Sequence, residues 1–194
     1  MSAIFLSASV PLIGRGHYHE NSNPFLIQCA VRELVLAVVR THRIVWGGHP
    51  SITPMLWTIC QDLGVDYSER VVLYQSAFFE DRFPEENVRF KNVQIIDSID
   101  NDRDSSLLRM RTHMLSRRDL EAAVFIGGME GVKHEYEIFR QFHPHATVLA
   151  LAAPGGAARD LANPDGRKAA HGYQGVDFAR IFHKMFGRGV DLTQ

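Results

Sequence analysis

Short apolar runs alternate with longer amphipathic runs along most of the chain. The short runs are continuously apolar, which is typical of strands covered on both faces of a parallel sheet, and they span residues 3–7, 43–47, 70–74, 93–97, 122–126 and 147–152. The longer runs have helical length and spacing and span residues 25–41, 53–64, 106–118 and 131–142. This alternation predicts an α/β fold, a Rossmann-like doubly wound parallel sheet in three α/β/α layers.

The last quarter of the chain has a different pattern. Residues after 153 are rich in glycine, alanine and proline, which favours a mobile loop with one short helix over another strand. A helical stripe then resumes at 176–186 through Val176, Ala179, Phe182, His183 and Phe186. We expect one domain over residues 1–194, with its core in 3–152 and a C-terminal loop and helix in 153–194.

Composition and charge narrow the class of protein. The chain has 194 residues, of which 45% are hydrophobic and 22% charged, as in ordinary globular domains. A net charge of −1 offers no basic excess for nucleic acid, so nucleic acid is not expected as the main partner. Two cysteines are too few for a disulfide framework, and there is no signal peptide or membrane-length run, which favours a cytoplasmic protein.

Serine or glycine turns follow several of the predicted strands. Ligands of open parallel sheets bind beyond the carboxyl ends of the strands, where glycine lets the backbone approach a phosphate. An ordinary tight turn is the alternative for each turn alone, but repeated turns at equivalent positions indicate a binding edge. The candidate ligand-binding residues are Ser7, Ser9, Gly47, Gly48, His49, Gly127, Gly128, Met129, Glu130 and Gly131, and a further glycine pair stands at 155–156.

Arg111 and Glu135 are the candidate catalytic residues. The helical neighbours of Arg111 at three or four positions are all apolar: Leu107, Leu108, Met114 and Leu115. A guanidinium on that face needs a carboxylate or a ligand phosphate; an arginine that snorkels to solvent and a structural ion pair are the alternatives. Glu135 borders the inner stripe of the next helix near its amino end, where a solvated glutamate is the alternative. We expect both side chains to approach the same sheet edge.

The chain resembles the SLOG superfamily in the order of three features: an arginine on one helix, then a strand, then a glycine-rich turn that opens the next helix. That superfamily groups the DNA-processing protein DprA with the Lonely Guy phosphoribohydrolases. Its signature reads Pro-Gly-Gly-x-Gly-Thr-x-x-Glu, and here the matching residues after Arg111 are Gly127, Gly128, Gly131 and Glu135. The runs IFLSAS (4–9) and IVWGGHPSITPM (44–55) are similar to the first two strands of the superfamily and their turns, so the resemblance covers about residues 3–152.

The same two runs look most like SLOG subfamilies of bacterial conflict systems, whose relatives sense nucleotide-derived signals such as ADP-ribose derivatives. Three positions depart from the signature. Ile126 replaces the proline, Glu130 is an extra residue in the glycine turn, and Val132 stands where the phosphate-contacting threonine belongs. A carboxylate at residue 130 opposes a phosphate unless it turns away or meets ribose hydroxyls.

Histidines and a long loop supply the remaining candidates. His49 can contact a ligand from the second glycine turn or simply be exposed, and Arg15, Tyr18 and His19 can form a lid or merely cover the sheet. The histidines and cysteines lack zinc-ligand spacing, so we expect no metal, and no cofactor is indicated.

Three functions fit these observations. The first is a sensor of a nucleotide-derived small molecule; the second is a nucleotide N-glycoside hydrolase in which Glu135 assists attack and Arg111 positions ribose or phosphate. The third is a protein-interaction module with a vestigial site. An effector protein of the same system is a possible partner. We also expect a homodimer. The resemblance implies pairing through the helices that border the site, and the last helix independently carries surplus apolar surface in Phe178, Ile181, Phe182, Met185 and Phe186.

Overall fold

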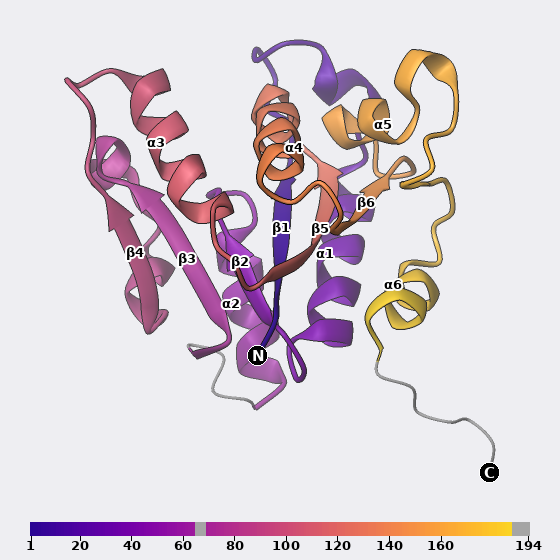
Figure 1. Cartoon of the computed structure of the whole chain (residues 1–194), viewed down its shortest axis with the longest axis horizontal. Helices are drawn as coiled ribbons and strands as arrows, with labels where there is room; N and C mark the ends of the chain where they lie inside the picture. The colour runs from indigo at the N-terminus through magenta and orange to yellow at the C-terminus, as the bar shows by residue number, and fades with distance from the viewer. Residues whose placement is uncertain (65–68, 188–194) are drawn as a thin grey trace.

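A parallel sheet organises the computed structural model, which describes residues 1–64 and 69–187. The strand order is β4-β3-β2-β1-β5-β6-β7, and every pairing is parallel. The seven strands are β1 Ala3–Ser9, β2 Arg43–Trp46, β3 Val71–Ser76, β4 Asn92–Ile96, β5 Leu120–Gly127, β6 Thr147–Leu151 and β7 Gly172–Tyr173. The chain order reverses at β1, whose neighbours are β2 and β5 (Figure 1). Such a switch point is where open α/β sheets bind ligands.

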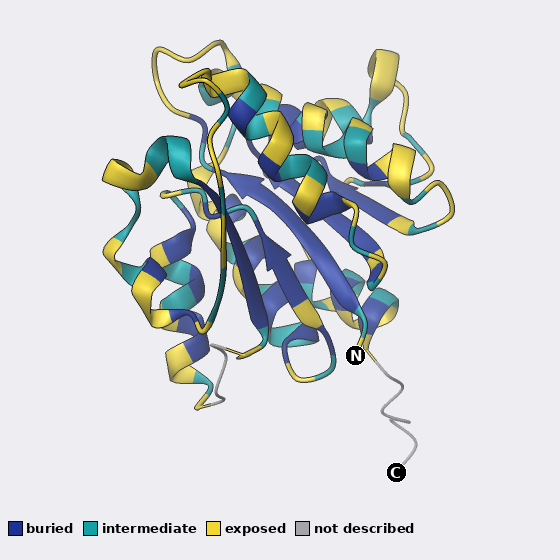
Figure 2. Cartoon of the chain, turned by 60° about the vertical axis from the view of Figure 1, so that its left-hand side comes forward, coloured by how far each residue is buried: buried dark blue, intermediate teal, exposed yellow. Residues whose placement is uncertain are grey.

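Helices cover both faces of the sheet, as the continuous apolar strands predict. One face packs against α1 (Pro24–Val38), α2 (Thr53–Asp62) and α6 (Phe178–Phe186). The other packs against α3 (Arg103–Leu115), α4 (Glu130–Phe142) and α5 (Gly156–Ala162). Alternate residues of β1 serve the two faces: Leu6 joins the first core and Phe5 the second. Figure 2 shows the buried strands enclosed between partly exposed helices.

The predicted doubly wound three-layer fold is confirmed, and each predicted strand and helix is present. Three details differ. The spacing of apolar residues in α1 favours an inner stripe of Leu26, Cys29, Ala30, Leu34 and Ala37. Of these only Ala30 and Leu34 are fully buried, together with Ile27, Val31, Val35 and Val38. On α3, Leu108 is 56% exposed, so the helix turns this leucine away from the core. The glycine-rich segment after residue 153 contains α5, but it also adds the unexpected strand β7 beside β6.

The last helix packs within the chain. Its residues Phe178, Phe182 and Phe186 are buried in the same core as α1, whereas His183, expected on the inner stripe, is exposed. The apolar surface that suggested a dimer is therefore largely covered by α1, and α6 by itself gives no argument for a second subunit. Within the described residues, no helix combines the length and hydrophobicity needed to cross a membrane.

Candidate functional site

A hydroxyl and a carboxylate meet beside the carboxyl end of β1. Ser7 is 1% exposed, and its Oγ donates a hydrogen bond of 2.5 Å to Oε2 of Glu135. Like Phe5, Ser7 points toward the face covered by α4, because side chains two positions apart share one side of a strand. Strand and helix thus place the two groups together although they lie 128 positions apart in the sequence.

Arg111 completes this group from α3. Its Nε lies 3.4 Å from Oε1 of Glu135, and the two side chains are 14% and 15% exposed. The carboxylate thus uses one oxygen for the serine and the other for the arginine, which orients it. The distance between Nε and Oε1 is long for a charged hydrogen bond, so the interaction between Arg111 and Glu135 is weak. The structure thus brings the side chains of Arg111 and Glu135 together.

Two glycines lie close to Arg111 and Glu135, in positions where a larger residue would crowd these side chains. A Cβ at Gly131 would lie 2.8 Å from Nη2 of Arg111, so the guanidinium passes directly over the first turn of α4. A Cβ at Gly47 would lie 3.6 Å from the methyl carbon of Met114 and 4.0 Å from Oε1 of Glu135. Met114 is therefore part of the apolar wall of the site, a role that its place on the inner stripe of α3 had not distinguished from ordinary core.

The remaining glycines of the turns serve close packing. At Gly48 (φ +71°) a Cβ would lie 1.6 Å from the buried Gln75 side chain, whose Nε2 donates to the Gly48 carbonyl at 3.1 Å. At Gly127 and Gly128, also at positive φ, a Cβ would meet side chains of the helices at 2.5 Å and 2.2 Å. At Gly155 (φ +77°) it would lie 1.9 Å from the carbonyl oxygen of residue 21. These turns need glycine for reasons independent of any ligand.

The turn between β5 and α4 is tied to its neighbours by backbone bonds. The Gly128 amide donates to the carbonyl of Ser9 at 2.7 Å, and the Ala157 amide donates to the carbonyl of Gly128 at 2.9 Å. By contrast, the amides of Met129, Glu130 and Gly131 have no acceptor within the described part of the chain. They form the open amino end of α4.

His49 holds the second turn against the chain that follows β1. Its Nδ1 lies 2.9 Å from Oγ of Ser51, and that oxygen accepts the amide of Val10 at 3.0 Å. Burial, together with the smaller effect of the positive charge of Arg15, lowers the pKa of His49 to about 4. His49 is therefore a neutral imidazole near pH 7. Ser51 was not among the residues expected from the sequence.

The loop before α1 reaches the mouth of the site through Tyr18, in the short helix η1 (Tyr18–Asn21). Its hydroxyl donates to Oε2 of Glu130 at 2.8 Å, and Nζ of Lys133 lies 5.2 Å from its ring centre. Lys133 also pairs with Asp160 at 3.0 Å. Burial raises the pKa of Tyr18, and the hydrogen bond with Tyr18 raises the pKa of Lys133. Tyr18 thus lies beside the first turn of α4.

The other two loop candidates stay outside this cluster. Arg15 is exposed, and its positive charge acts on His49 by helping to lower the pKa of that imidazole. Nδ1 of His19 lies 3.1 Å from the carbonyl oxygen of Gly16, within its own loop.

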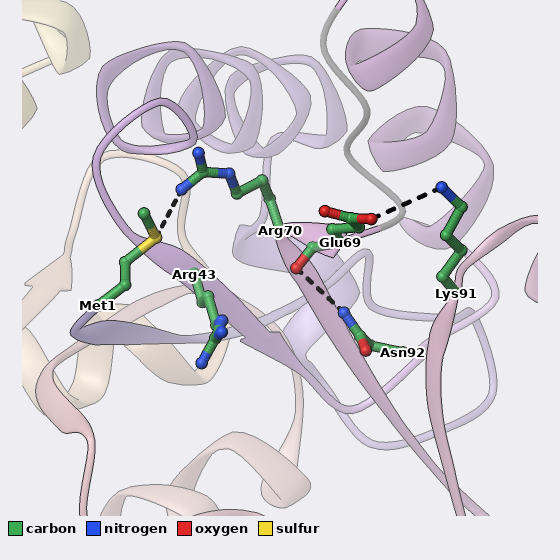
Figure 3. A pocket seen from close by; sticks show the side chains of 6 residues that line it. All are labelled: Met1, Arg43, Glu69, Arg70, Lys91 and Asn92. Atoms are coloured by element: carbon green, nitrogen blue, oxygen red, sulfur yellow. Dashed lines mark hydrogen bonds and ion pairs between the residues drawn. The ribbon is translucent and has the colours of Figure 1, made fainter.

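A separate hollow of about 430 Å³ lies at the opposite, amino edge of the sheet (Figure 3). Its lining includes Arg43, Arg70 and Lys91 at the starts of successive strands. Nζ of Lys91 lies 3.8 Å from Glu69, so part of this positive charge is balanced inside the hollow. Because ligands of parallel sheets bind at the carboxyl edge, the hollow is not the candidate site.

The group at the carboxyl edge has a defined chemical capacity. A guanidinium donates to phosphate or sugar oxygens, and an ionised carboxylate accepts from ribose hydroxyls or takes a proton from water. No three His, Cys, Asp or Glu side chains gather to bind a metal in residues 1–64 and 69–187.

Comparisons with known proteins agree with the fold. The profile of the family described as "SLOG cluster3 family" matches residues 17–186. Among solved structures, the X-ray structure of TM1055, a structural genomics target, superposes with a TM-score of 0.59 at 15% identity, covering 95% of this chain and 99% of that chain. At that identity the likeness shows the fold alone. No curated protein matches the chain.

Proposed function

Since the chain belongs to the SLOG cluster3 family, we propose that it binds a nucleotide-derived small molecule at the carboxyl edge of its sheet. The observation that carries the proposal is the convergence of Arg111, Glu135 and Ser7 beside β1, at the switch point of the sheet. ADP-ribose derivatives and nucleoside phosphates combine the sugar hydroxyls and phosphates that these groups recognise. We propose a sensing role in a cytoplasmic antiviral defence system, with an effector protein as its partner.

Sensing is favoured over catalysis by the turn that precedes α4. Val132 is buried and has no hydroxyl to offer a phosphate, and Glu130 places a carboxylate at the first residue of the helix. Both features weaken a monophosphate site of the hydrolase type.

An N-glycoside hydrolase is the second candidate, and the Ser7–Glu135 bond is the observation that favours it. The serine hydroxyl orients the carboxylate, as a general base requires. In the reaction, Glu135 would take a proton from water as the water oxygen bonds to the anomeric carbon. The base would leave with the electrons of the N-glycosidic bond and be protonated.

Calorimetry with nucleoside monophosphates, NAD and ADP-ribose tests the binding proposal. Arg111→Ala should weaken binding, whereas Arg103→Ala, at an exposed arginine that begins the same helix, should not. Chromatography of the same mixtures for free base tests the second candidate, and release of base that is lost in Glu135→Gln would overturn the pure sensor. Silence of the wild-type protein across the panel would favour the interaction module with a vestigial site.

We also propose a homodimer, now through α3 rather than α6. The outer side of α3 exposes Leu108 and borders a mainly apolar groove lined in part by Ile99 and Thr112. A pairing there would bring the helices that carry Arg111 close together. Light scattering at micromolar concentration tests this, and a strictly monomeric mass would remove the proposal.

A further inference from the structure

The amino end of α4 has the usual properties of an anion site. The amides of Met129, Glu130 and Gly131 point to no acceptor in the described residues, and the helix dipole places partial positive charge there. Arg111 lies over the same turn, at Gly131. A ligand phosphate would ordinarily be favoured at this position.

The protein instead supplies its own anion at this helix end. Glu130 is the first residue of α4, and the Tyr18 hydroxyl holds its Oε2 at 2.8 Å. The neighbouring Lys133 does not cancel this charge, because it pairs with Asp160 at 3.0 Å. The corner formed by Glu130, Lys133 and Asp160 therefore carries one net negative charge beside the amino end of α4.

We propose that Glu130, held in place by Tyr18, makes the site select a ligand that presents sugar hydroxyls, not a terminal phosphate, to the first turn of α4. This inference rests on the proposed function and adds the class of ligand. A carboxylate can accept several hydrogen bonds, and Tyr18 uses one of them. Neighbouring ribose hydroxyls are matching donors, whereas a terminal phosphate brings a second negative charge against Glu130. The predicted ligand is a nucleotide derivative that ends in a sugar.

ADP-ribose and ADP make a suitable pair of probes, because they share the adenosine diphosphate part and differ in a terminal ribose. We expect the full chain to bind ADP-ribose at least about tenfold more tightly than ADP, the scale of a hydrogen bond to a charged group. Glu130→Gln should reduce this ratio about tenfold, because it removes the charge that attracts hydroxyls and repels phosphate. Tyr18→Phe should reduce the ratio less, because the charge stays but is no longer held.

Glu137→Gln is the matched control, since Glu137 is exposed on the same helix, about two turns further along. It should leave the ratio unchanged. Glu130 is itself exposed, and melting curves would verify that both variants fold. Isothermal titration calorimetry measures all the dissociation constants.

Each outcome decides a separate point. A wild-type protein that binds ADP as tightly as ADP-ribose, or a ratio unaffected by Glu130→Gln, would overturn this inference while leaving nucleotide binding intact. If neither probe nor any other nucleotide of the panel binds the wild-type protein, the proposed function fails, and this inference fails with it.

Discussion

Replacing Arg111 by alanine separates a ligand-binding arginine from a structural one. The substitution removes the partner that lies 3.4 Å from Oε1 of Glu135. It leaves a carboxylate that is 15% exposed and still receives the Ser7 hydroxyl at Oε2. Two quantities then change for different reasons. The free energy of unfolding decreases because the Glu135 carboxylate has lost its cationic partner. The free energy of ligand binding becomes less favourable because the guanidinium no longer contacts the ligand.

The structure sets the size of each change. Truncating one member of a fully buried pair costs about 3–5 kcal/mol. Here the contact is long, both side chains reach solvent, and Ser7 continues to solvate Glu135, so we expect a loss of about 1–2 kcal/mol and a melting temperature lower by about 2–8 °C. Binding of ADP-ribose should weaken by about 2–3 kcal/mol, a factor of about 30–150, because a charged hydrogen bond to the ligand is lost.

Thermal melting followed by circular dichroism and calorimetric titration with ADP-ribose measure the two changes on the same samples. Arg103→Ala, at an exposed arginine that begins the same helix, serves as the control, and both quantities should stay near those of the wild-type protein. A variant that melts more than about 10 °C lower, yet binds ADP-ribose normally below its melting temperature, would show that Arg111 belongs to the core and not to the site.

Three further substitutions test other parts of the argument. Gly131→Ala places a Cβ 2.8 Å from Nη2 of Arg111, so calorimetry should show ADP-ribose binding weakened about tenfold with little change in melting; normal binding would show that the guanidinium position is unimportant. Gly155→Ala puts a Cβ 1.9 Å from a backbone carbonyl at φ +77° and should cost about 2–4 kcal/mol in urea unfolding, whereas Gly64→Ala, at φ +60° in open space, should cost about 1 kcal/mol. His49 has a pKa of about 4 in the folded protein, below its ordinary 6.5. Between pH 6.5 and about pH 4 the unfolded chain therefore binds more protons than the folded chain, and the free energy of unfolding decreases as the pH is lowered through this range. Relative to His49→Gln, denaturant titrations should show the wild-type protein losing at most about 3 kcal/mol over this range, and equal pH profiles would contradict the assignment.

Sequence patterns were sufficient for the architecture because local periodicity carries that information. Continuous apolar strands require cover on both faces, and their alternation with helices leads to a parallel doubly wound sheet. The pattern also placed Arg111 and Glu135 on the inner sides of successive helices. Since both helices border the carboxyl edge, their meeting followed from the topology, and the structure brings them within 3.4 Å.

Sequence alone therefore determined β1 to β6, the helices that cover them and the layers they form, because each depends on short-range repeats of polar and apolar residues; β7 was not expected. Tertiary structure decided which glycines border the site, since Gly131 faces Arg111 whereas Gly155 packs against a loop more than a hundred positions away. It also decided that Tyr18 reaches Glu130, 112 positions along the chain, and that α6 covers α1. These pairings depend on the volumes and directions of side chains from distant segments, and no local period in the sequence specifies them.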